Sequence, residues 1–173
     1  MSRSTGYEAL LGHARNNSRV CLADPLVIVD KDDNYDEVID QLLSLVAKNS
    51  KEKTVEVLQS STIAPGMIGN AEKGDGAGAK QNEQIFNERK RIAKQSAHNQ
   101  TEFFGMMALA QMGSRPGSAG EKRGLQPAVQ KELMGFLAKG KGQKKPWAAM
   151  SLGVFGNALL ENDGTLESTV LSA

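Results

Sequence analysis

The sequence predicts an all-α protein, an α-solenoid of antiparallel helix pairs about three repeats long. Similar ten-residue segments recur at 61–70, 105–114 and 148–157, at offsets of 44 and 43 residues. A period of this size is typical of stacked helical repeats. Apolar residues also recur at helical spacing between the copies, and Gly-rich stretches separate the expected helices.

The three copies share small residues at two positions, where neighbouring helices would approach closely. The first position holds Ala64, Ala108 and Ser151, and the second holds Gly66, Ala110 and Gly153. Each copy also ends in a glycine, at Gly69, Gly113 and Gly156. Because glycine adopts the left-handed conformation without a steric penalty, we expect these residues to end their helices in that conformation.

Helical periodicity and stop signals divide the chain into six expected helices. They span residues 35–48, 52–69, 82–96, 99–113, 125–139 and 146–160, and the B and A helices of the repeats alternate in this order. The strongest apolar stripe contains Leu125, Val129, Leu133, Phe136 and Leu137. We therefore predict a partly irregular N-terminal segment over residues 1–34 and a repeat domain over residues 35–173. The last copy lacks its B helix, although Leu166, Val170 and Leu171 could begin one.

One residue interrupts the regular pattern. Pro65 stands where the other copies have leucine, and a proline inside a helix removes a hydrogen bond at a cost of about 3 kcal/mol. We therefore expect a kink or a split helix between Ser61 and Pro65.

The runs A-L-A-Q-M-G at 108–113 and P-W-A-A-M-S-L-G-V-F-G at 146–156 resemble HEAT repeats and the related bilin-lyase-like HEAT group. Helix A of that group often reads W-A-A-x-A-L-G-x-x-G. The resemblance covers about residues 36–160, and the Gly-rich inserts resemble those of HEAT repeats in large bacterial multidomain proteins. It implies a stack whose B helices line a concave face that binds a partner. The missing polar cap at the C-terminal end suggests a longer array or a docking surface.

Charge is distributed unevenly along the chain. The net charge is +1, but residues 80–145 contain 13 Lys and Arg against 5 Asp and Glu. If the basic side chains converge on the B-helix face, that surface would attract phosphates or an acidic peptide. The candidate partner-binding residues are Arg89, Lys90, Arg91, Lys94, Lys131, Lys139, Lys141, Lys144 and Lys145. The alternative is an ordinary solvated helix surface.

No catalytic or metal-binding pattern is recognisable. His13, His98 and Cys21 do not have the spacing of a metal site, and residues 74–80 lack the second Gly and the hydroxyl of a phosphate-binding loop. We interpret residues 74–80 as a flexible linker and His98 as a surface or capping residue at a helix start. Trp147 is expected to pack between neighbouring repeats, with an exposed binding hot spot as the alternative.

Together these features predict a non-catalytic protein-binding or assembly scaffold without a cofactor. Two alternatives stay open: a protein that binds the nucleic-acid backbone through residues 80–145, and a bilin-lyase-like HEAT protein. The sequence has no signal peptide and no apolar run long enough to span a membrane, so the cytosol is the expected compartment. The pattern does not specify an oligomeric state.

Overall fold

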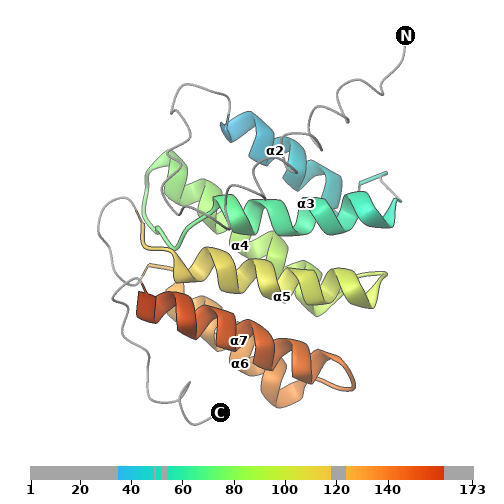
Figure 1. Ribbon diagram of the computed structural model, residues 1–173. Helices are drawn as coiled ribbons and strands as arrows, with labels where there is room; N and C mark the ends of the chain where they lie inside the picture. Colours follow the sequence, from blue (N-terminus) through green and yellow to red (C-terminus); the bar gives the residue numbers. More distant parts are fainter. Residues whose placement is uncertain (1–34, 49, 52–53, 118–123, 162–173) are drawn as a thin grey trace. The chain divides into compact units, whose positions relative to one another are not determined.

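In a computed structural model that describes residues 35–48, 50–51, 54–117 and 124–161, every regular element is an α-helix (Figure 1). The helices are α2 (Tyr35–Val46), α3 (Val55–Ile68), α4 (Ala77–Lys94), α5 (Asn99–Ser114), α6 (Gln126–Lys139) and α7 (Lys144–Glu161). They belong to one compact unit that begins at Asp36. The predicted all-α class is therefore confirmed for the described residues. Among them, no helix is long and apolar enough to cross a membrane.

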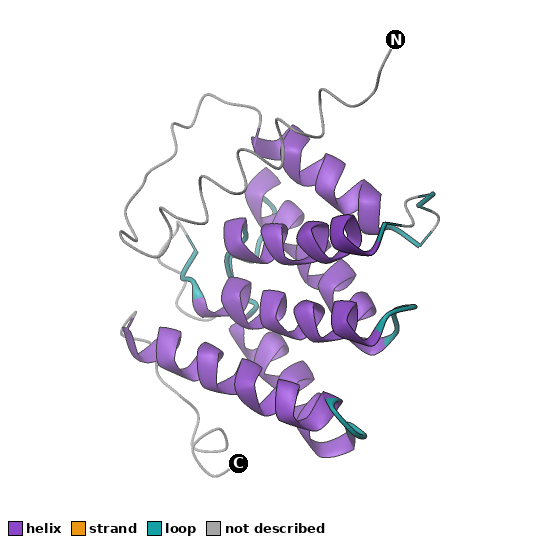
Figure 2. Cartoon of the chain, turned by 45° about the vertical axis from the view of Figure 1, so that its right-hand side comes forward, coloured by secondary structure: helices purple, strands orange, loops and turns teal. Residues whose placement is uncertain are grey.

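Three of the helices lie side by side, with α5 between α3 and α7 (Figures 1 and 2). Helix α4 packs mainly on α5, and α6 packs on both α7 and α5. The buried core between these helices contains Ile85, Phe103, Met106, Leu109, Met112, Val129, Leu133, Leu152 and Phe155. Helices α3, α5 and α7, which alternate in sequence with α4 and α6, thus form one layer.

Small residues allow close contact within this layer. A Cβ atom built on Gly66 of α3 would lie 2.5 Å from the Cα of Ala108 on α5, so no larger residue fits without a shift of the backbone. On the other side of α5, the Ser151 hydroxyl of α7 lies 3.3 Å from the sulfur of Met107. The predicted role of small residues in close helix approach is confirmed at these positions.

The predicted left-handed helix ends are wrong. Gly69 has φ −64° and ψ 162°, an extended conformation, while Gly113 and Gly156 lie inside α5 and α7. The role of Gly113 is packing, because a Cβ atom there would lie 2.7 Å from both Cγ atoms of Val129 on α6. Among the described glycines, positive φ angles occur instead at Gly74, Gly124 and Gly142, which all lie between helices.

Helix α4 begins earlier than predicted, at Ala77 and not at residue 82. Residues 77–80 of the expected flexible linker at 74–80 therefore belong to the helix. Two asparagines hold the start of this helix: the amide of Asn82 donates to Asn70 Oδ1 at 2.7 Å, and the backbone N–H of Asn70 donates to Asn82 Oδ1 at 3.0 Å. This reciprocal pair fixes the turn between α3 and α4, which a Gly-rich sequence alone would leave flexible.

Candidate binding surface

Arg89 stabilises the helix that contains proline. Helix α3 continues through Pro65 without a split, although Pro65 has no N–H to donate to the Ser61 carbonyl. The Nη1 group of Arg89 on α4 donates to that carbonyl at 2.8 Å and to the Thr62 carbonyl at 2.8 Å. The guanidinium therefore replaces the backbone donor that the proline removed.

This position corrects one predicted partner-binding residue. Arg89 is fully buried, with 0% of its surface exposed, so it cannot belong to an exposed basic surface. Burial lowers the pKa of its guanidinium to about 9, because a charged group loses its hydration there. Arg89 is a structural residue that joins α4 to α3.

Lys90 and Lys94 join α4 to α6. The Lys90 ammonium lies 2.6 Å from Glu132 Oε1, and the Lys94 ammonium lies 3.2 Å from Glu132 Oε2. Lys90 also lies 5.6 Å from the centre of the Phe86 ring. Partial burial raises the pKa of Glu132, but the hydrogen bonds and positive charges of both lysines outweigh this effect, so the pKa lies below the ordinary value of a glutamate.

Two more of the predicted residues make contacts between elements. Arg91 donates to Glu88 at 2.8 Å and to the carbonyl of Val46 at the end of α2. Lys144 at the start of α7 lies 2.9 Å from Glu102 Oε2 and donates to the Lys94 carbonyl at 3.2 Å. Lys144 thus joins the beginning of α7 to α5 and to the end of α4.

The four remaining predicted residues are exposed lysines that make no ion pair with another described residue: Lys131, Lys139, Lys141 and Lys145. Lys139, Lys141 and Lys145 surround the turn between α6 and α7, whereas Lys131 lies on the exposed surface of α6. The nine basic residues therefore form no single patch. Five of them serve internal contacts and four remain available to a partner.

Glu132 and Glu102 were not identified from the sequence. Glu102 is 6% exposed, and its first carboxylate oxygen accepts a hydrogen bond from the Ser96 N–H at 3.1 Å. Each glutamate forms ion pairs with a helix that is not its neighbour in the sequence: Glu132 of α6 with α4, and Glu102 of α5 with α7. The spacing of residues in the sequence does not predict ion pairs between such distant helices. The excess of lysine over glutamate was the only available signal.

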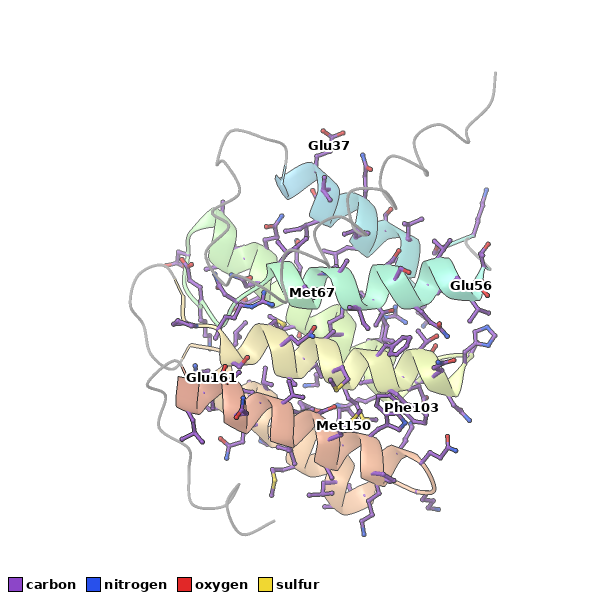
Figure 3. All side chains as sticks on the ribbon, viewed as in Figure 1. Glu37, Glu56, Met67, Phe103, Met150 and Glu161 are labelled. Carbon is purple, nitrogen blue, oxygen red and sulfur yellow. The ribbon has the colours of Figure 1, made fainter. Side chains whose placement is uncertain are left out.

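Trp147 packs between neighbouring helices of one layer, as predicted. Its ring stacks on that of Phe103 of α5, with 5.2 Å between the ring centroids and 11° between the ring planes. The ring of Phe104 meets it edge-on, with 6.4 Å between the centroids (Figure 3, where Phe103 is labelled). These contacts fix the start of α7 against α5. His98 lies exposed before α5, and its side chain makes no capping hydrogen bond.

Among the described residues, no three His, Cys, Asp or Glu side chains form a group that would hold a metal ion. His13 and Cys21 lie outside the described residues. No family model matches the sequence, and comparisons with curated proteins and with solved structures also give no match.

Proposed function

We propose that the chain is a HEAT-like α-solenoid module that binds a protein partner through the outward faces of α4 and α6. The observation that carries this proposal is the ion-pair bridge from Glu132 to Lys90 and Lys94. The bridge links α4 to α6 through one carboxylate, which supports a preorganised arrangement of their outward faces. Preorganisation favours binding because less side-chain and backbone freedom is lost on association.

The repeat relation supports the solenoid part of the proposal. Helices α3, α5 and α7 carry the three similar segments, and each packs against the next through small residues. In a stack of this kind, each repeat contacts only its neighbours and the repeats together present an extended surface.

The outward faces of α4 and α6 offer polar and small side chains to a partner. The exposed residues are Lys80, Gln84, Asn87 and Lys94 on α4 and Pro127, Lys131, Ala138 and Lys139 on α6. Such a surface suits a polar partner with some acidic character.

Photo-crosslinking in the source cell tests the surface. A photoreactive residue placed at Asn87 or Lys131 should capture one common partner, whereas the same residue at exposed Ser60 on α3 should not. Equal capture from all three positions, or no capture from Asn87 and Lys131, would refute the proposal.

Binding measurements with the captured partner then test the bridge. Glu132→Lys replaces the ion pairs with a cluster of like charges and should weaken binding at least tenfold. Glu56→Lys makes the same change at an exposed site on α3 and should leave affinity unchanged.

A second candidate function is binding to phosphate groups of a nucleic-acid backbone. Lys139, Lys141 and Lys145 surround one turn and are not neutralised by any described residue, and the N-terminus of α7 adds a partial positive charge. If these three lysines contact phosphates, log K for duplex DNA should fall with log salt at a slope of about −2.7. Absence of binding at low salt would eliminate this candidate.

A matched pair of variants locates such binding. The triple change of Lys139, Lys141 and Lys145 to Gln should remove it. The triple change of Lys48, Lys51 and Lys80 to Gln removes the same charge from other exposed positions and should preserve it.

A further inference from the structure

Helix α7 has a continuous exposed face that is mostly apolar. Eight of its residues are exposed, and they recur at helical spacing along one side: Lys145, Pro146, Ala149, Met150, Gly153, Asn157, Leu160 and Glu161. Met150 is 45% exposed and Leu160 is 61% exposed. Figure 3 labels Met150 and Glu161 on this helix. One charged residue stands at each end of the face, and no charged residue lies between them.

The equivalent face of α5 is a helix-packing surface. An offset of 43 residues relates Met107 to Met150 and Ala110 to Gly153. Met107 contacts Ser151 of α7, and Ala110 is fully buried. Met107 and Ala110 are therefore covered by neighbouring helices, whereas their counterparts on α7, Met150 and Gly153, are exposed.

Gly153 adds an independent indication. A glycine inside a helix is less favourable than alanine, because its backbone loses more conformational freedom on folding. A Cβ atom built on Gly153 would meet nothing within 4 Å, so no packing inside the described chain requires glycine there. The equivalent Gly66 does require glycine, because the backbone of Ala108 lies against it. A second helix could therefore approach Gly153 as closely as α5 approaches Gly66.

We propose that this face of α7 binds the same face of α7 in a second copy of the chain, with the two helices antiparallel and crossing at Gly153. The face is symmetric about that residue. Pro146 and Leu160 lie seven residues on either side of it, and Lys145 and Glu161 lie eight residues on either side. A two-fold axis at Gly153 therefore places Lys145 of each copy level with Glu161 of the other along the helix axis. The two residues lie on opposite edges of the face, about 160° apart around one helix, so each pair must reach across the edge of the interface.

Charge and geometry both fit this arrangement. Eight residues of helix span about 12 Å, so at a shallow crossing angle of about 20° the two ends remain within reach of long side chains. The amide of Asn157 donates to Glu161 Oε1 at 2.8 Å, which holds the carboxylate on this face. Because a two-fold interface uses the same patch twice, each dimer gains two lysine–glutamate pairs.

The exposed face of α7 is a different surface from the proposed partner-binding face of α4 and α6, and dimerisation through α7 does not require a partner on that face. A single pair of helices buries less area than a typical stable interface, so the dimer should be weak and concentration-dependent.

Sedimentation equilibrium of the full chain over a concentration series tests the proposal. The wild type should show a monomer–dimer equilibrium. Lys145→Glu and Glu161→Lys, each alone, replace both ion pairs by repulsion and should raise the dissociation constant roughly tenfold. A 1:1 mixture of the two variants should associate more tightly than either variant alone, because both pairs in the heterodimer join opposite charges. One pair has the native arrangement, and in the other the two charges are exchanged.

Met150→Glu together with Leu160→Glu should abolish the dimer, and retained helical circular dichroism would show that this variant is folded. Four results would each overturn the proposal. They are a monomeric wild type at all concentrations, a third copy in the assembly, dimerisation that survives the two glutamates, and single charge variants that associate as tightly as the wild type.

Discussion

A double-mutant cycle can measure how well Arg89 replaces the backbone hydrogen bond that Pro65 cannot make. Arg89→Met keeps much of the buried volume but removes both bonds, leaving the Ser61 carbonyl of α3 without a donor. A buried acceptor without a partner costs about 1–3 kcal/mol. In the Pro65→Ala background, the new backbone N–H can donate to Ser61, so the same change of Arg89 should cost less.

We therefore expect a coupling free energy of about 1–3 kcal/mol between Arg89 and Pro65, with the double variant more stable than the sum of the single effects. The free energy of unfolding in urea, followed by helical circular dichroism, measures all four corners of the cycle. Arg91→Met provides the control, since Arg91 donates to Glu88 and Val46 and not to the carbonyls beside Pro65. Coupling smaller than about 0.5 kcal/mol, or equal coupling for the control, would refute this role of Arg89.

Three further predictions concern stability. The pKa of Glu132 is lowered in the folded protein, so its ion pairs stabilise the fold above the ordinary pKa of a glutamate, and this stabilisation is lost as pH falls through the folded value. Glu132→Gln should therefore cost about 1 kcal/mol at neutral pH and almost nothing in acid, and a pH-independent loss would contradict the assignment. Gly66→Ala should lower the unfolding free energy by about 1–3 kcal/mol through overpacking, while Gly153→Ala, measured at dilution, should raise it by about 1 kcal/mol. Trp147→Ala should cost about 3–5 kcal/mol and Trp147→Phe clearly less, as measured by thermal unfolding, because Phe preserves stacking on Phe103.

The sequence predicted the helices well because their signals are local. Apolar spacing and repeat offsets located five of the six helices with starts within three residues of the observed ones. The start of α4 was missed, because the sequence around Gly78 favours a linker while the Asn70–Asn82 pair favours the helix. Tertiary contacts of this kind override local propensity.

The candidate site was less predictable, because charge alone does not show where a side chain points. Arg89 and Lys90 are adjacent in sequence, yet one is fully buried and the other bridges to α6. Residues one apart lie on different faces of a helix, so the basic run could not belong to a single surface. The need for Arg89 was nevertheless implicit at Pro65, where a missing backbone donor calls for another donor.

The linker after α3 makes backbone hydrogen bonds to two later parts of the chain. The backbone N–H of Ala71 donates to the Arg115 carbonyl at 3.0 Å, and the Ala71 carbonyl accepts from the Leu125 N–H at 2.7 Å. These bonds join the linker after α3 to the end of α5 and the start of α6 without using any side chain. Gly124 permits them, since a Cβ atom there would lie 1.8 Å from the Ala71 oxygen. Because these bonds use backbone atoms alone, most substitutions in the linkers would preserve them, whereas any side chain at Gly124 would collide with the Ala71 carbonyl and displace this junction.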